Sequence, residues 1–202
     1  MKRTILALMM MCMVLAVTGC GGGDSRPVFT TDIFSDETVD GYITELFPSG
    51  TLLITQGAPS VFAGVDTLTL DESRGFLDFA LGDIPLDANI ASASLRLFIR
   101  DVAFPVGSVP IMIELVSFPP LTGADYDRAP VTGSAVIYPI LASDRDNYVT
   151  IDVTQLVAQA QVRGLDFSIR IMQDDLVADA RGVVEIDDTA VTTAPRLRVS
   201  YF

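Results

Sequence analysis

The sequence contains no histidine and no tryptophan, and its only lysine is Lys2. Without histidine, a Ser-His-Asp or Cys-His catalytic arrangement is excluded, and so is a zinc or non-haem iron site with histidine ligands. No glycine-rich phosphate loop opens a helix, so an enzyme would have to rely on carboxylates, tyrosine, arginine or an oxygen-ligated metal ion. These absences favour a protein that binds rather than catalyses, and we expect no enzyme activity.

Cysteine is also scarce, because Cys12 and Cys20 are the only two and both lie near the N-terminus. Lys2 and Arg3 precede an apolar run over residues 5–17, which has the layout of a secretory signal and is short for a membrane span. The sequence Val-Thr-Gly-Cys at residues 17–20 resembles a bacterial lipobox. The resemblance implies cleavage before Cys20 and acylation of its sulfur and new amino group.

We therefore expect a signal peptide over residues 1–19 and a lipid attachment site at Cys20. The alternative is an ordinary secretory signal that happens to contain a cysteine. Several acyl chains on one residue form a stable membrane anchor. In a host with two membranes, glycine rather than aspartate at position 21 resembles the sorting pattern for the outer membrane, on its periplasmic or cell-surface face.

The chain beyond residue 19 is strongly acidic. It holds 11 arginines and all 26 acidic residues, a net charge of −15, because Lys2 and Arg3 are the only basic residues before it. This balance argues against nucleic acid as a partner and against docking on anionic lipid by charge. With Cys12 discarded and Cys20 acylated, no disulfide forms within the mature chain, so a hydrophobic core must stabilise it.

Two segments between residues 74 and 100 alternate apolar and polar residues, the pattern of strands with one face in a core and one in water. The expected core residues are Leu77, Phe79 and Leu81 in the first segment and Leu95, Leu97 and Ile99 in the second. Arg96 and Arg100 alternate with the second set, so we expect them to point to solvent.

Short segments of similar character recur along the chain. We expect further strands over residues 28–34, 40–47, 51–55, 66–71, 110–117, 135–138, 148–152, 165–171, 183–186 and 196–201, loops over 56–65 and 118–130, and one helix over 153–162. Many short strands and one short helix favour an all-β fold, an antiparallel two-sheet β-sandwich of the jelly-roll kind. We expect residues 20–38 to form a flexible tether and residues 39–202 to form the domain.

Several motifs resemble the DNRLRE domain, a family that overlaps with the alginate-type carbohydrate-binding modules of family 96. They are Asp40-Gly-Tyr, the segment 74–85, the segment 90–99, Tyr126-Asp-Arg-Ala-Pro, the segment 151–157 and the closing segment 194–201. The resemblance spans nearly the whole expected domain. It implies a non-catalytic module of secreted and surface proteins, some of which bind polysaccharide.

A sandwich binds glycans through aromatic faces and through hydrogen bonds from arginine and aspartate. The loop 118–130 offers Tyr126, Asp127 and Arg128, and the polar side of the second strand offers Arg96 and Arg100. We expect these five residues to form the ligand-binding site, with a core or rim position for the aromatic ring and a solvated face for the arginines as the alternative. A structural or protein-interaction role in the cell envelope or extracellular matrix is the alternative function.

Three groups of acidic residues offer oxygen ligands to Ca²⁺. They are Asp144 with Asp146, Asp174 with Asp175 and Asp179, and Asp187 with Asp188. None of the three has the spacing of an EF-hand, so solvated acidic loops are the alternative to a calcium site.

Overall fold

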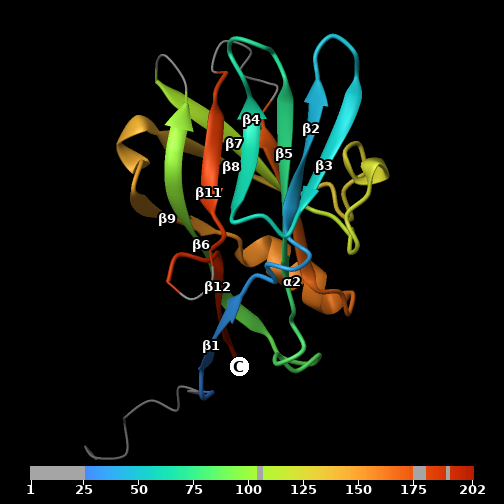
Figure 1. Ribbon diagram of the computed structural model, residues 1–202. Coiled ribbons are helices and arrows are strands. Elements are labelled where there is room, and N and C mark those ends of the chain that lie inside the picture. Colours follow the sequence, from blue (N-terminus) through green and yellow to red (C-terminus); the bar gives the residue numbers. More distant parts are fainter. Residues whose placement is uncertain (1–25, 104–106, 175–180, 190–191) are drawn as a thin grey trace, which may run out of the picture.

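The computed structural model describes residues 26–103, 107–174, 181–189 and 192–202, and this part of the chain is all-β with one α-helix (Figure 1). The expected fold class is therefore confirmed. The strands are β1 (Phe29–Phe34), β2 (Gly41–Leu46), β3 (Thr51–Gln56), β4 (Ser60–Val65), β5 (Glu72–Phe79), β6 (Ile90–Ala103), β7 (Ser108–Leu115), β8 (Ala135–Leu141), β9 (Asn147–Asp152), β10 (Phe167–Gln173), β11 (Val183–Asp187) and β12 (Arg196–Tyr201). The helix is α2 (Thr154–Val162), and two short 3-10 turns are η1 (Gly123–Asp125) and η2 (Ala142–Asp144).

Hydrogen bonds join these strands into one antiparallel sheet in the order β1-β12-β6-β11-β4-β5-β10-β7-β8. The β2–β3 hairpin branches from β5, and β9 branches from β6. Two separate sheets, as a sandwich requires, are not confirmed. Strands β4 and β5 pair only at Gly64–Ser73 and Val65–Glu72, so the sheet is free to bend there. Apolar side chains from both sides of this bend meet in one core, which shows that the sheet curls around it.

Strand β6 is the longest strand and organises the sheet. Its first half pairs with β12 and its second half with β11, while β9 pairs along its other edge. Leu95, Leu97 and Ile99 are fully buried, as the alternation predicted, and Arg96 and Arg100 lie on the opposite face. Helix α2 packs against β6, and the Asp152 carboxylate accepts a hydrogen bond from the N–H of Thr154 at its start.

The order of loop and strand before β5 differs from the prediction. Residues 60–65, expected within a loop, form β4, and residues 66–70, expected in a strand, form the turn that follows it. The Asp66 carboxylate accepts hydrogen bonds from the N–H groups of Leu68 and Thr69, and Leu70 has a φ of 67°. Local hydrogen bonds from aspartate therefore outweigh the apolar alternation of this segment.

The domain also begins earlier than predicted. Residues 29–34 form β1, confirming the expected edge segment, and pair with β12 through six residues, from Phe29–Tyr201 to Phe34–Arg196. Ile33 belongs to the core. The tether was expected to extend to residue 38, but the sheet includes β1, so that boundary is wrong.

The central strands β5 and β10 are buried on both faces, whereas the alternation predicted one face in water. Asp78 is only 9% exposed, and Arg170 only 4%. The segment that follows β7 covers this second face and forms a smaller apolar cluster there, which consists of Ile43, Phe76, Val116, Phe118, Leu121 and Tyr126. The periodicity within a strand does not depend on whether a segment from elsewhere in the chain covers its polar face. The alternation therefore could not predict that this second face is buried.

Candidate functional site

The loop 118–130 does not present Tyr126 as an exposed binding aromatic, so that prediction is wrong. Tyr126 is 2% exposed, and its ring packs in the smaller apolar cluster beneath the guanidinium of Arg74, at 3.8 Å from the ring centroid. Burial raises the pKa of its hydroxyl well above the usual value. The alternative for this ring, a position in the core, is the one that the structure shows.

Two arginines hold the loop to the sheet. Arg74 Nη1 donates to the Tyr126 carbonyl at 2.6 Å and to the Asp127 carboxylate at 2.9 Å. Arg170 Nη1 donates to the same carbonyl at 2.7 Å. Arg128 pairs with the buried Asp125 within the loop. The predicted set of Tyr126, Asp127 and Arg128 therefore lies together, but its polar groups fasten the loop to β5 and β10.

The outward face of β6 carries the other predicted arginines beside two aromatic rings. Phe98 and Tyr148 are directly opposite each other in the β6–β9 pairing, and their rings meet edge to face with centroids 5.0 Å apart. The Arg96 guanidinium lies 3.7 Å from the centroid of the Tyr148 ring. Tyr148 is 38% exposed, and the Arg96 side chain forms no hydrogen bond or ion pair with any described residue. We call Arg96, Phe98 and Tyr148 the arginine–aromatic face.

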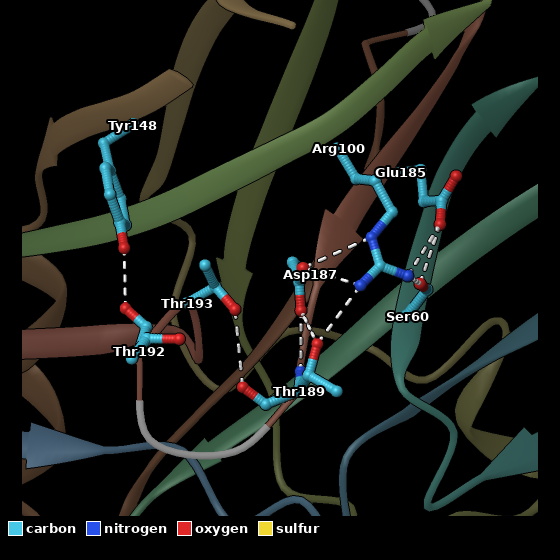
Figure 2. Close-up of polar contacts among 8 residues, drawn as sticks. All are labelled: Ser60, Arg100, Tyr148, Glu185, Asp187, Thr189, Thr192 and Thr193. Carbon is cyan, nitrogen blue, oxygen red and sulfur yellow. Dashed lines mark hydrogen bonds and ion pairs between the residues drawn. The ribbon is translucent and has the colours of Figure 1, made fainter. Parts of the chain in front are cut away.

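Arg100 lies farther along the same side of β6, but its donors are occupied (Figure 2). Nε and Nη2 donate to Asp187 Oδ2 at 3.2 and 2.7 Å, and Nη1 donates to the Ser60 hydroxyl at 3.1 Å. Burial raises the pKa of Asp187, but hydrogen bonds from Thr189 and Arg100 outweigh it and hold the pKa below its usual value. Arg100 thus ties β6 to β4 and to the end of β11.

The Tyr148 ring is itself oriented by the segment that follows β11. Its hydroxyl donates to the carbonyl of Thr192 at 2.6 Å, and Figure 2 shows this bond beside the Arg100 network. Arg96 and the Thr192 carbonyl therefore restrict the ring from two sides. A ring that is held before a ligand arrives loses little conformational freedom on binding.

Two further arginines extend the positive charge onto β12. Arg196 is directly opposite Arg96 in the β6–β12 pairing, and Arg198 forms a two-point ion pair with Asp32 at 2.7 and 2.8 Å. Arg196 approaches the same carboxylate at 3.6 Å. The sequence placed both arginines on the outward side of the last strand, because they alternate with Leu197. It gave no signal that β12 pairs with β6, so they could not be joined to this face.

The groups on this face determine what it can recognise. Guanidinium groups donate several hydrogen bonds to carboxylates and hydroxyls, and aromatic rings stack on the apolar faces of sugars or on cations. Arg96 combines a free set of donors with a ring against which it is already stacked. The arrangement therefore suits a ligand that carries both hydroxyl and carboxylate groups.

The predicted calcium ligands do not converge. Asp144 accepts a hydrogen bond from the N–H of Leu141, while Asp146 occupies a turn with a φ of 58°. Asp174 is buried beyond β10, and residues 175 and 179 lie outside the described part of the chain. The Asp187 carboxylate pairs with Arg100, whereas the Asp188 carboxylate accepts a hydrogen bond from the Ser35 hydroxyl. Within residues 26–103, 107–174, 181–189 and 192–202, no three acidic, histidine or cysteine side chains are grouped as metal ligands.

Comparison of the chain with models of known protein families and with curated proteins gives no match. In the described part of the chain, no helix has the length and apolar character needed to cross a bilayer. Cys20 and the predicted signal peptide lie outside the described residues.

Proposed function

We propose that this chain is a non-catalytic binding module that an N-terminal lipid anchor displays in the cell envelope, and that it binds polysaccharide. The observation that carries the proposal is the stacking of Arg96, at 3.7 Å, on the half-exposed ring of Tyr148, with no carboxylate partner among the described residues. Most other arginines in the described chain already pair with acidic groups. Arg26 also lies over a ring, that of Phe202, but at 5.6 Å from its centroid, so the close stacking of Arg96 distinguishes this surface.

Acidic glycans fit the chemistry of this face better than neutral ones. Uronate carboxylates match the planar donors of a guanidinium, and sugar rings match the aromatic surface. The net charge of −15 beyond residue 19 opposes such a ligand at long range, and salt screens this repulsion. Binding should therefore be weak at low ionic strength and stronger at moderate ionic strength. The sequence resemblance to the DNRLRE and family 96 modules supports the same ligand class.

Titration of the protein with polyuronate tests the proposal directly, and a neutral glycan serves as the comparison ligand. Tyr148→Ala should weaken polyuronate binding by about tenfold, equivalent to about 1.4 kcal/mol, because it removes the ring and releases Arg96. Arg96→Ala should have a similar effect. Arg163→Ala is the matched control, since Arg163 lies at the end of α2 and caps the Gln159 carbonyl. Equal affinity of all four proteins for polyuronate would remove this face from the site.

A second function, as a structural or protein-interaction component of the envelope or matrix, is favoured by apolar side chains on edge strands. Leu53 and Ile54 on β3 are about half exposed, at 49% and 48%, and Ile137 and Leu141 on β8 are 52% and 45% exposed. Each of these strands pairs on one side only. Exposed edges of this kind favour contact with other chains. Absence of binding to either glycan would favour this second function.

The anchor is tested separately. Cys20→Ser should release the protein from membranes, because the lipobox-like sequence requires the cysteine sulfur for acylation. Membrane fractionation of cells that express each form measures the effect. A Cys20→Ser protein that stays fully in the membrane fraction would contradict lipid attachment at this residue.

A further inference from the structure

Two buried carboxyl groups from distant parts of the sequence lie against the same short segment. Asp40 precedes β2 and is fully buried, and Asp188 follows β11 and is 2% exposed. The N–H of Gly57 donates to the Asp40 carbonyl at 2.9 Å, and the N–H of Asp188 donates to the Pro59 carbonyl at 3.0 Å. Besides burial, the charge of Asp188 raises the pKa of the Asp40 carboxyl, so the two carboxyls lie near each other.

Each carboxyl has one satisfied and one free oxygen. Asp40 Oδ1 accepts from the N–H of Asp78 at 2.7 Å, and Asp188 Oδ1 accepts from the Ser35 hydroxyl at 3.3 Å. The Oδ2 atom of each is buried and has no hydrogen-bond partner in the described structure. Neither carboxyl takes part in an ion pair among the described residues. Two buried carboxylates without a counter-charge are costly unless something supplies one.

The surroundings add negative charge rather than offset it. Burial, followed by the charge of Asp188, raises the pKa of Asp40 to about 8. Burial, with Glu37, Asp187 and Asp36 nearby, raises the pKa of Asp188 to about 7. A cation between the two carboxyls would supply the counter-charge that their surroundings lack.

We propose that Asp40 and Asp188 bind one divalent cation of the calcium class through their free Oδ2 atoms. A cleft of about 350 Å³ leads to Asp188, and its lining includes Glu37, Gly57 and Thr189. Calcium takes six to eight oxygen ligands in flexible geometry, including carbonyls and water, whereas magnesium demands a regular octahedron. With no third acidic side chain grouped here among the described residues, backbone carbonyls and water complete the shell, which favours calcium.

The cation would join three separated parts of the fold. Asp40 lies in the segment between β1 and β2, Asp188 follows β11, and both contact the segment between β3 and β4. A bound cation would therefore stabilise the domain.

Thermal melts and calorimetric titration of the purified protein, freed of metal with a chelator, test this site. We expect CaCl₂ to raise Tm, to bind with one-to-one stoichiometry and to act more strongly than MgCl₂. Asp188→Asn and Asp40→Asn should each abolish the rise in Tm, since an amide keeps the Oδ1 acceptor but loses the charge. Asp87→Asn, at an exposed aspartate of the β5–β6 connection, should respond to CaCl₂ as the wild type does.

Two results would overturn the site. The first is that CaCl₂ neither binds to the wild type by calorimetry nor changes its Tm. The two carboxyls would then be protonated and would bind no cation. The second is an equal calcium response in wild type and Asp188→Asn, which would place the cation elsewhere. Polyuronate titrations repeated in excess chelator keep this question separate from the proposed function, because they report on the arginine–aromatic face without a bound cation.

Discussion

Replacing Arg170 by alanine should lower the free energy of unfolding by about 3–5 kcal/mol, the range for breaking a buried ion pair by removing one partner. Arg170 is 4% exposed, and its Nη2 donates to Glu114 Oε2 at 2.6 Å. Its Nη1 also donates to the Tyr126 carbonyl at 2.7 Å. The variant leaves Glu114, whose side chain is only 12% exposed, without a counter-charge and releases the loop that covers the central strands. Urea unfolding, followed by circular dichroism, measures the loss.

Two comparisons separate the buried ion pair from a general effect of losing an arginine. Arg198→Ala breaks an ion pair with Asp32 at the surface, where the arginine side chain is 52% exposed, and should lower the free energy of unfolding far less than Arg170→Ala does. The double variant Arg170→Met with Glu114→Leu should recover much of the loss, because no charge is left buried and unpaired. If Arg170→Ala and Arg198→Ala were equally stable, the proposed role of Arg170 as the anchor of the loop would be wrong.

The strands that the sequence predicted best are those whose one side faces the core and whose other side faces solvent. In β6, Leu95, Leu97 and Ile99 alternate with Arg96 and Arg100, and the structure places the two sets on opposite faces. A period of two in the sequence reflects a difference in burial between the faces. Both faces of β10 are buried. Polar residues such as Arg170 still alternate with apolar residues in this strand, but the alternation does not indicate that the polar face is exposed to solvent.

The sequence could not predict the sheet connectivity. The alternation specifies the direction of each side chain but not the neighbour of each strand, so it does not predict that β2 branches from β5 and β9 from β6. For the same reason the single curled sheet differs from the two separate sheets that were expected. Strand β4 was missed because Val61, Phe62 and Ala63 form a short apolar run without alternation, and such a run has no period to detect.

The candidate site shows the same limit. The alternation of β6 predicts that Arg96 faces solvent, and in the structure it lies on the outward face of the strand beside Tyr148. The position of Tyr126 in a long polar loop predicts an exposed aromatic ring, but Tyr126 is buried in the structure. Whether a loop side chain is exposed depends on the surface against which the loop folds. Asp40 and Asp188 are 148 residues apart in the numbering, so only the folded chain shows that their carboxyls lie near each other.

Leu97→Ala should be among the most destabilising single substitutions in the core, at about 2–5 kcal/mol, because it removes a large apolar side chain and leaves a cavity. Leu97 is fully buried at the middle of β6, where it pairs with Val149 of β9. Strand β6 contacts β9, β11 and β12, so the surrounding backbone is held from both sides and cannot collapse easily into the space. Guanidinium unfolding measures the change through the midpoint of the transition at constant slope.

The neighbouring substitution Arg96→Ala is the matched control, since it alters the same strand on the opposite face. It removes a stacking contact with Tyr148 at a partly exposed site, so it should cost well under about 1 kcal/mol. Unfolding curves that ranked the two variants the other way would contradict the assignment of β6 faces. If the ranking holds, Arg96→Ala is a folded protein with an altered surface. Any loss of polyuronate binding in Arg96→Ala would then report on the arginine–aromatic face and not on the stability of the domain.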